Sequence, residues 1–323
     1  MNQNKIALAV HGGAGTILKS EITREIEDEY REGIKTALRE GWNILQNGGS
    51  AVDAVEAAVV ELENFPLFNA GRGAVFTHDG KNEMDACLMN GKNRQAGAVA
   101  FVRNIKNPIK LARLVLERTE HVLLAGSGAN DFAKEMNVEF KPDEYFFTDL
   151  RFQQLLKARR ENTIQLDHTA DESEIIESRL ALEDEKKFGT VGAVACDASG
   201  NVAAATSTGG MTNKKFGRIG DTPLVGAGTY ADNETCAVSC TGHGEFFIRE
   251  LAAYDAASLM KYKNLNLKDA ATEVIEKLRG IGGEGGLIAV DKRGNLALPF
   301  NSAGMYRGFI TPDGKMNIKI YQD

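Results

Sequence analysis

The sequence of 323 residues is poor in cysteine, and no two cysteines form a CxxC pair. The four are Cys87, Cys196, Cys236 and Cys240, which lie far apart or in stretches typical of strands. Structural zinc sites need closely spaced thiols, and disulfide frameworks belong to short, cysteine-rich secreted chains. We therefore expect free, buried thiols, with neither a zinc site nor a disulfide framework.

The sequence also lacks an apolar run long enough to cross a bilayer and an excess of basic residues. Its 38 Lys and Arg stand against 45 Asp and Glu, a net charge of −7, which disfavours general binding to nucleic acid. The first five residues carry one positive charge, and the short apolar run at 6–10 leads straight into glycines, unlike a signal peptide. We expect a cytoplasmic protein with no membrane partner and no nucleic-acid partner.

Motifs for nucleotide binding and serine-esterase chemistry are missing as well. The glycine-rich run HGGAG at 11–15 does not match GxGxxG, no GK[ST] follows it, and the chain has no GxSxG elbow. We interpret this run as a tight loop where chain segments cross closely, with His11 in a structural role.

What is present is a globular pattern, with 43% hydrophobic residues in short periodic stretches. Helical periodicity predicts helices over residues 21–47, 51–62, 107–116, 130–136, 245–259 and 267–279. Short apolar runs predict strands over residues 5–10, 74–77, 82–89, 96–102, 122–126, 191–196, 202–206, 236–241, 287–291 and 295–299. Both halves mix strands and helices, so we expect layered α+β or α/β packing, with a flexible polar segment at 151–187.

The stretch at 187–197 changes abruptly from charged to small and β-branched residues. Gly189 followed by Thr190 is typical of a glycine turn into a buried strand. It also permits chemistry, because cutting the Gly189–Thr190 bond would place a free α-amine beside the threonine hydroxyl. Further on, Arg218 and Asp221 lie in a glycine-flanked loop. They suit the α-carboxylate and α-amine of an amino acid, but these residues alone favour a surface ion pair.

Several motifs together resemble those of the plant-type L-asparaginase and isoaspartyl peptidase family. In the second half they are GTVGAV (189–194), ATSTGGMTNK (205–214), GRIGD (217–221), TGHGE (241–245) and GMYRG (304–308). In the first half they are HGGAG (11–15), GGSA (48–51) and FNAG (68–71). Each motif is weak alone, but their common order over nearly the whole chain makes the resemblance specific.

The resemblance implies a fold and a reaction. The family belongs to the N-terminal nucleophile hydrolases, whose α+β fold is a four-layer αββα sandwich and whose members cut themselves before a catalytic threonine. Residues 1–323 would form one domain, cut into an α chain of 1–189 and a β chain of 190–323. The enzyme would hydrolyse L-asparagine and β-aspartyl dipeptides and release aspartate, with no cofactor for catalysis, as a homodimer of αβ units.

The resemblance also implies which residues carry out the reaction. Thr190 would be the nucleophile, with its own α-amine as the base, and Thr208 would hydrogen-bond it. The Thr241 hydroxyl and the Gly242 backbone N–H would form the oxyanion hole.

Substrate binding would fall to a second group of residues. Arg218 and Asp221 would hold the α-carboxylate and α-amine of the substrate, and Gly244 would add a backbone contact. Asn69 would approach the nucleophile from a loop of the first half.

A structural sodium ion is implied as well, bound through backbone carbonyls. The candidate ligands are Leu62, Glu63, Phe65, Phe68 and Ala70. His243 stands where some relatives have a smaller or hydroxyl residue, and we expect it to pack or to tune entry to the pocket.

Three rival functions share this fold. A glycosylasparaginase-like amidase is disfavoured because we expect no signal peptide, and a protein-cutting threonine aspartase is disfavoured because the loop at 213–217 is short. A non-catalytic binding protein would be expected to have lost the nucleophile or the carboxylate clamp, and both are present in this sequence.

Overall fold

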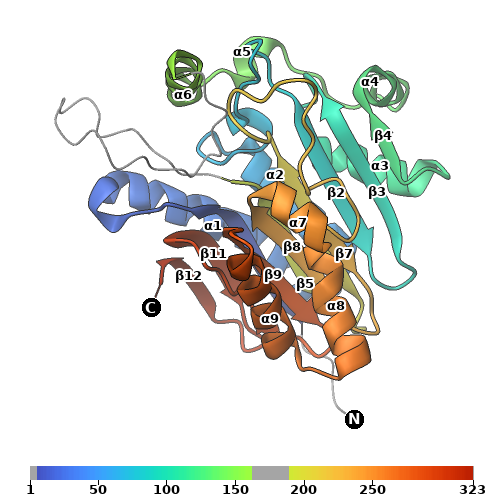
Figure 1. Ribbon diagram of the computed structural model, residues 1–323. Coiled ribbons are helices and arrows are strands. Elements are labelled where there is room, and N and C mark those ends of the chain that lie inside the picture. Colours follow the sequence, from blue (N-terminus) through green and yellow to red (C-terminus); the bar gives the residue numbers. More distant parts are fainter. Residues whose placement is uncertain (1–5, 162–188, 323) are drawn as a thin grey trace.

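The computed structural model describes residues 6–161 and 189–322, in which a sheet of eight strands faces a sheet of four (Figure 1). Across the larger sheet the strands are β12 (Met316–Tyr321), β11 (Gly304–Ile310), β1 (Ala7–Gly15), β5 (Val191–Cys196), β6 (Val202–Thr208), β2 (Met84–Asn90), β3 (Gln95–Val102) and β4 (Leu123–Ala125). Across the smaller sheet they are β10 (Leu296–Ala297), β9 (Gly285–Asp291), β8 (Cys236–Gly242) and β7 (Thr229–Ala231). Neighbouring strands are antiparallel except β3 and β4, which are parallel.

Helices pack on both sheets (Figure 1). Those on the larger sheet are α1 (Arg24–Gln46), α2 (Ala51–Asn64) and α3 (Pro108–Arg118). Those on the smaller sheet are α8 (Ala252–Lys263) and α9 (Leu267–Gly280). The shorter helices are α4 (Gly126–Glu135), α5 (Asp143–Phe146), α6 (Asp149–Arg160) and α7 (Gly244–Glu250). The expected mixed fold of helices and two sheets is thus confirmed.

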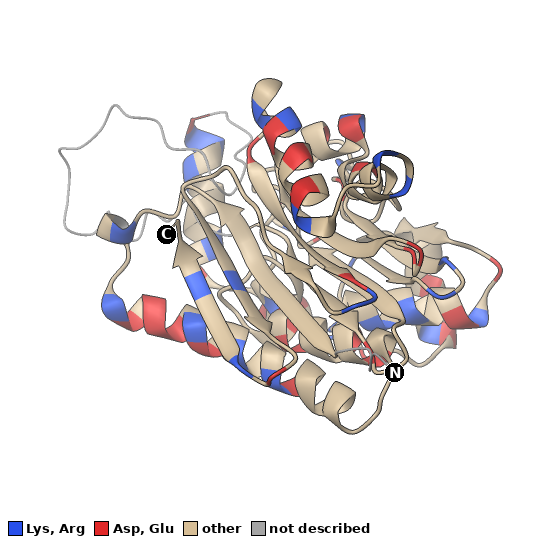
Figure 2. Ribbon diagram, turned by 90° about the horizontal axis from the view of Figure 1, so that it is seen from below, with Lys and Arg blue, Asp and Glu red and all other residues tan. Residues whose placement is uncertain are grey.

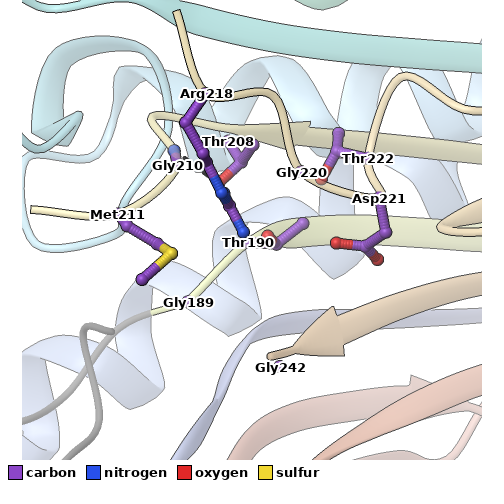
Figure 3. Close-up of a pocket in the computed structure, with 10 residues that line it drawn as sticks. All are labelled: Gly189, Thr190, Thr208, Gly210, Met211, Arg218, Gly220, Asp221, Thr222 and Gly242. Carbon is purple, nitrogen blue, oxygen red and sulfur yellow. Dashed lines mark hydrogen bonds between the residues drawn. The ribbon is translucent and has the colours of Figure 1, made fainter. Parts of the chain in front are cut away.

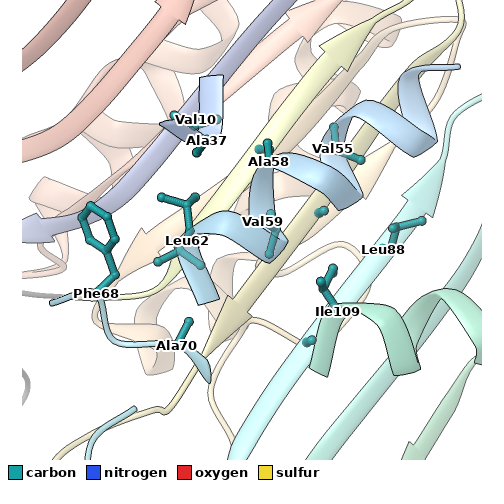
Figure 4. Close-up of a cluster of buried hydrophobic side chains, with 14 of the residues drawn as sticks. Val10, Ala37, Val55, Ala58, Val59, Leu62, Phe68, Ala70, Leu88 and Ile109 are labelled. Atoms are coloured by element: carbon teal, nitrogen blue, oxygen red, sulfur yellow. The ribbon is translucent and has the colours of Figure 1, made fainter. Parts of the chain in front are cut away.

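Strand β5 shows how small residues build the core. Its Val191, Ala193 and Ala195 belong to the apolar cluster shared with α1, α2 and α3, part of which is drawn in Figure 4. Its Val194 and Cys196 belong to the second cluster, shared with the smaller sheet, α8 and α9. Since successive side chains of a strand point to opposite faces, both faces of β5 are buried, and small or β-branched residues fit there.

The predicted loop at 11–15 is wrong, because these residues continue β1 and pair with β11 as far as Gly15 opposite Gly304. The ladder shifts between His11 and Gly13, where Gly13 has a φ of 114° that only glycine adopts readily. The interpretation as a close crossing is confirmed. A Cβ at Gly13 would lie 2.5 Å from the Gly189 nitrogen.

Other expected elements also differ. Residues 74–77 form no strand, since β2 pairs with β3 and β6 and the expected hairpin partner is not used. The expected helix at 245–259 is split into α7 and α8 at Leu251, whose φ of 49° interrupts helical geometry. Strands β7, β11 and β12 were not expected. Of the polar segment, α6 covers the first part, and residues 162–187 lie outside the described residues.

Charged residues of both signs gather on the helices in Figure 2, whereas the strands are largely free of them. The four cysteines are free and buried, as expected. Over residues 6–161 and 189–322, no helix is both long and apolar enough to cross a membrane. In the same ranges, no cluster of three or more His, Cys, Asp or Glu could hold a metal ion.

Candidate active site

Thr190 lies immediately before β5, in the middle of the larger sheet. Strand β5 is antiparallel to β6, and the pairing of Val191 with Ser207 places Thr190 beside Thr208. Both threonines are nearly buried, with exposed fractions of 7% and 3%. The expected nucleophile and its expected hydrogen-bonding partner therefore lie at the same end of two neighbouring strands.

A pocket opens at this end of the strands (Figure 3). It is lined by Gly189, Thr190, Thr208, Gly210, Met211, Arg218, Gly220, Asp221, Thr222 and Gly242. In Figure 3 the side chains of Arg218 and Asp221 lie close to Thr190 and come from one loop. Residues expected for cleavage, for the oxyanion hole and for substrate binding thus meet in one cavity.

The two charged residues of the pocket differ in how well they are paired. Arg218 donates from Nε and Nη2 to the two carboxylate oxygens of Glu245, both at 2.9 Å. Asp221 is 3% exposed, and its Oδ2 is buried with no hydrogen-bond partner among the described residues. Burial raises the pKa of Asp221 to about 7, and the positive charge of Arg218 opposes this rise. A carboxylate in this state can accept a hydrogen bond from a ligand's ammonium group.

Gly244 does not line the pocket, but it lies directly behind the charged pair. A Cβ at this position would be 2.8 Å from Asp221 Oδ1 and 3.0 Å from Arg218 Nη2. Any side chain here would therefore press on both charged groups, which explains why glycine is needed.

The residues expected for the oxyanion hole lie at the end of β8. Gly242 lines the pocket with a φ of 145°, and a Cβ there would collide with the Glu284 carbonyl oxygen. Thr241 is fully buried, and its Oγ1 has no hydrogen-bond partner in the part of the chain that the structure describes. Buried hydroxyls are usually paired, so this one has an unused hydrogen-bonding capacity, although Thr241 is not among the residues that line the pocket.

Asn69 is close to the nucleophile's neighbours but does not line the pocket. Its Nδ2 donates to Gly210 O at 2.8 Å, and its Oδ1 accepts from Val75 N at 3.0 Å. Thr208 Oγ1 accepts from Gly210 N at 3.0 Å. Asn69 therefore supports the turn after β6, with both polar ends of its side chain already in use.

Comparison with known proteins agrees with this geometry. A family model described as asparaginase matches residues 4–320. The chain belongs to the asparaginase family. It is 52% identical to an isoaspartyl peptidase of Salmonella typhimurium over 307 residues, or 95% of each chain. It is also 52% identical to an isoaspartyl peptidase of Escherichia coli over 306 residues, 94% of this chain and 92% of the relative. A probable isoaspartyl peptidase/L-asparaginase 2 of Arabidopsis thaliana is 44% identical over 326 residues, 98% and 99% of the two chains.

In this asparaginase-family chain, the expected sodium ligands lie where α2 ends and in the loop that follows. They are Leu62, Glu63, Phe65, Phe68 and Ala70. A Cβ at Gly71 would collide with the Glu63 carbonyl oxygen, and one at Gly73 would collide with that of Phe68. The carbonyl oxygens of Glu63 and Phe68 therefore lie close to glycines of this loop, and carbonyl oxygens are ligands that hard cations prefer. Arg151, fully buried, donates to Gly73 O at 3.0 Å and Leu67 O at 3.3 Å, outside the expected set.

His11 was expected to be structural, and the fold places it close to the nucleophile. It is fully buried, its Nε2 lies 2.9 Å from Ser239 Oγ, and burial lowers its pKa to about 3 while a backbone group of Thr190 opposes this. Such an imidazole is neutral at physiological pH and serves to pack and to hydrogen-bond.

Several residues near the pocket of this asparaginase-family member were not expected from the sequence. Glu245 holds Arg218, Met211 lines the cavity, and Lys214 is buried with its Nζ donating to Glu83 O at 2.7 Å. Glu245 and Lys214 lie inside the motifs TGHGE and ATSTGGMTNK, so their position was a usable signal, but their contacts were not readable from it. His243 packs its ring against Phe246 at 4.7 Å between centroids and does not line the pocket.

Proposed function

We propose that the chain is an isoaspartyl peptidase that also hydrolyses L-asparagine, activated by cleavage of its Gly189–Thr190 bond. The observation that carries this proposal is the pocket in which Thr190 lies beside Arg218 and Asp221, whose Oδ2 has no hydrogen-bond partner among the described residues. The names of the relatives, isoaspartyl peptidase and isoaspartyl peptidase/L-asparaginase, support the substrate class.

Activation would begin with the Thr190 hydroxyl attacking the Gly189 carbonyl carbon. The peptide C–N bond breaks as the ester C–O bond forms, and the Thr190 nitrogen takes up the proton to become an amine. Water then hydrolyses the ester and leaves Thr190 as a new N-terminus. The close packing of Gly13 against Gly189 supports this step, because it restrains the bond that must be attacked.

In the activated protein the Thr190 α-amine, with a pKa of about 7.7–8.0, would accept the hydroxyl proton. The hydroxyl would attack the side-chain carbonyl of asparagine or of a β-aspartyl peptide, and ammonia or an amino acid would leave. The Thr241 hydroxyl and the Gly242 N–H would stabilise the oxyanion, and Thr208 would orient the nucleophile. Water would then release aspartate from the ester.

The substrate's α-amine and α-carboxylate would be held by Asp221 and Arg218. Both groups are free in a β-aspartyl unit, whereas an ordinary peptide bond consumes one of them at each residue. This pair of opposite charges supports selection of the β-linkage over ordinary peptides.

Further features implied by the family resemblance also belong to this proposal. The two facing sheets with helices on their outer sides support the four-layer αββα sandwich and a single domain. The carbonyl oxygens of the loop after α2 support a sodium ion that would stabilise this loop without taking part in the reaction. A homodimer of αβ units, a cytoplasmic location and the lack of a nucleic-acid partner remain predictions.

The proposal is tested by intact-mass measurement together with an activity assay. The wild-type protein should separate under denaturing conditions into residues 1–189 and 190–323 and should hydrolyse β-Asp-Leu. The Thr190→Ala variant should stay intact and inactive, since it has no hydroxyl, while Thr190→Ser should retain cleavage. A wild-type chain that stays whole, or a Thr190→Ala variant that hydrolyses β-Asp-Leu, would contradict the proposal.

A further inference from the structure

Glu245 already engages part of the guanidinium group of Arg218. A guanidinium has five N–H donors, and the carboxylate takes two of them, from Nε and Nη2, each at 2.9 Å. The arginine side chain is 19% exposed and the glutamate side chain 44%, so the pair lies between the pocket and solvent. The charge that is expected to attract a ligand's carboxylate is therefore already matched by a carboxylate of the chain.

The position of Glu245 is well defined. It lies in the first turn of α7, where a negative charge is favoured by the helix dipole. His243 also approaches this carboxylate, with Nε2 3.5 Å from Oε2. Glycines at 220 and 244 pack against the guanidinium, since a Cβ would lie 2.9 Å from Nη1 or 3.0 Å from Nη2. A ligand's carboxylate must therefore share the guanidinium with Glu245 or displace it.

The proposed reaction makes this competition useful. Substrate and product both carry the α-amine and the α-carboxylate of an aspartyl unit, so a clamp built only from Arg218 and Asp221 would hold released aspartate as tightly as it holds substrate. Interactions made equally with the ground states before and after the reaction give no gain in rate.

We propose that Glu245 is an internal competitor for Arg218 that weakens the hold on the α-carboxylate and so promotes release of the product aspartate. This inference rests on the proposed function. Glu245 then limits affinity for any ligand with an α-carboxylate and leaves unchanged the affinity for ligands without one.

The test is calorimetric binding of two probes to the matured protein. L-Aspartate carries the α-carboxylate, and β-alanine is the same molecule without it. The Glu245→Gln variant keeps the size of the side chain and removes its charge. At pH 8, where Asp221 is largely ionised, we expect this variant to bind aspartate about three- to tenfold more tightly, since one partly exposed charge pair is released, and to bind β-alanine nearly as the wild type does.

Glu250→Gln is the matched control, because Glu250 is an exposed residue of the same helix and the change in charge is identical. Aspartate should bind this variant as it binds the wild type. Glu245→Asp keeps the charge but shortens the reach, and it should bind aspartate with intermediate affinity. This variant carries the test if Glu245→Gln does not fold.

Three outcomes of this experiment would contradict the inference or the function on which it rests. Unchanged or weaker binding of aspartate by Glu245→Gln overturns the inference, because Glu245 would then be neutral or would only orient Arg218. Equal tightening for β-alanine also overturns it, since the effect would not depend on the α-carboxylate. A wild-type protein that neither binds aspartate nor hydrolyses β-Asp-Leu refutes the proposed function itself, which is a distinguishable result.

Discussion

Replacing Asp221 by asparagine tests how the site recognises the substrate's α-amine. The carboxylate is nearly buried, one of its oxygens has no hydrogen-bond partner in the described ranges, and burial raises its pKa to about 7. A protonated carboxyl group cannot pair with an ammonium ion. The kcat/KM of the wild type for β-Asp-Leu should therefore fall as the pH drops below about 7, by about tenfold for each pH unit in addition to the tenfold fall caused by protonation of the Thr190 α-amine.

The size of the effect follows from the lost interaction. A hydrogen bond to a charged group is worth about 1.5–3 kcal/mol, so Asp221→Asn should lower kcat/KM for β-Asp-Leu about 10- to 150-fold at pH 8. N-succinyl-leucine offers the same scissile amide without the α-amine. Its hydrolysis should change little in the variant, and its pH profile should lack the dependence on Asp221.

Ionisation of the Asp221 carboxyl group should support activity but lower the stability of the folded protein. Its pKa is about 7 in the folded protein against an ordinary 3.8, so the folded protein keeps a proton that the unfolded chain has lost between these values. The stabilising contribution is therefore complete below the ordinary pKa and is lost as the pH rises through about 7. A difference of about three pKa units corresponds to a few kcal/mol. Asp221→Asn cannot ionise and should melt at a higher temperature than the wild type at pH 8.

The difference in melting temperature should narrow as the pH is lowered towards 5. Equal loss of activity on both substrates would refute the reasoning about the α-amine. A variant that melts below the wild type at every pH would refute the reasoning about the buried charge.

Two further predictions follow from glycines that the structure leaves no room to replace. Gly13→Ala should slow self-cleavage, measured by intact mass over time, because its Cβ would lie 2.5 Å from the Gly189 nitrogen; Gly48→Ala, also at positive φ but with open space around it, should cleave normally. If sodium binds the loop after α2, the melting temperature should be higher in sodium chloride than in choline chloride at equal ionic strength. The Gly71→Ala variant, whose Cβ would collide with the Glu63 carbonyl oxygen, should show no such difference. Equal melting temperatures of the wild type in the two salts would argue against the ion.

Much of the fold could be predicted from local patterns, and the errors have physical reasons. The small and β-branched residues of β5 indicated a buried strand, and the helical patterns of α1 and α2 were clear. The glycines of β1 suggested a loop, yet here they allow close packing against Gly189 within a strand ladder that shifts its register between His11 and Gly13. The break between α7 and α8 could not be predicted, because the residue in the left-handed conformation there is Leu251 and not a glycine.

The residues of the site could be predicted from the sequence, but the contacts between them could not. Motifs identified Thr190, Arg218 and Asp221, and the fold brings these residues into one pocket. The contact between Arg218 and Glu245 joins residues 27 positions apart. Only the folded structure shows that the guanidinium of Arg218 is already hydrogen-bonded to a carboxylate of the chain. The raised pKa of Asp221 likewise depends on burial, which no local pattern reports.

The strand order of the larger sheet has a consequence for recovery from denaturation. Strands β11 and β5 flank β1, and β5 and β6 lie between β1 and β2, so strands from before and after Gly189 are mixed within one sheet. Once the bond is cut, two separate molecules would be interleaved through ladders of backbone hydrogen bonds. The intact chain folds in a unimolecular reaction, whereas the cut protein, once unfolded, must reassemble by a bimolecular encounter whose yield depends on concentration. Folding must therefore come before cutting, and the matured protein would owe its persistence to slow unfolding more than to an ability to refold.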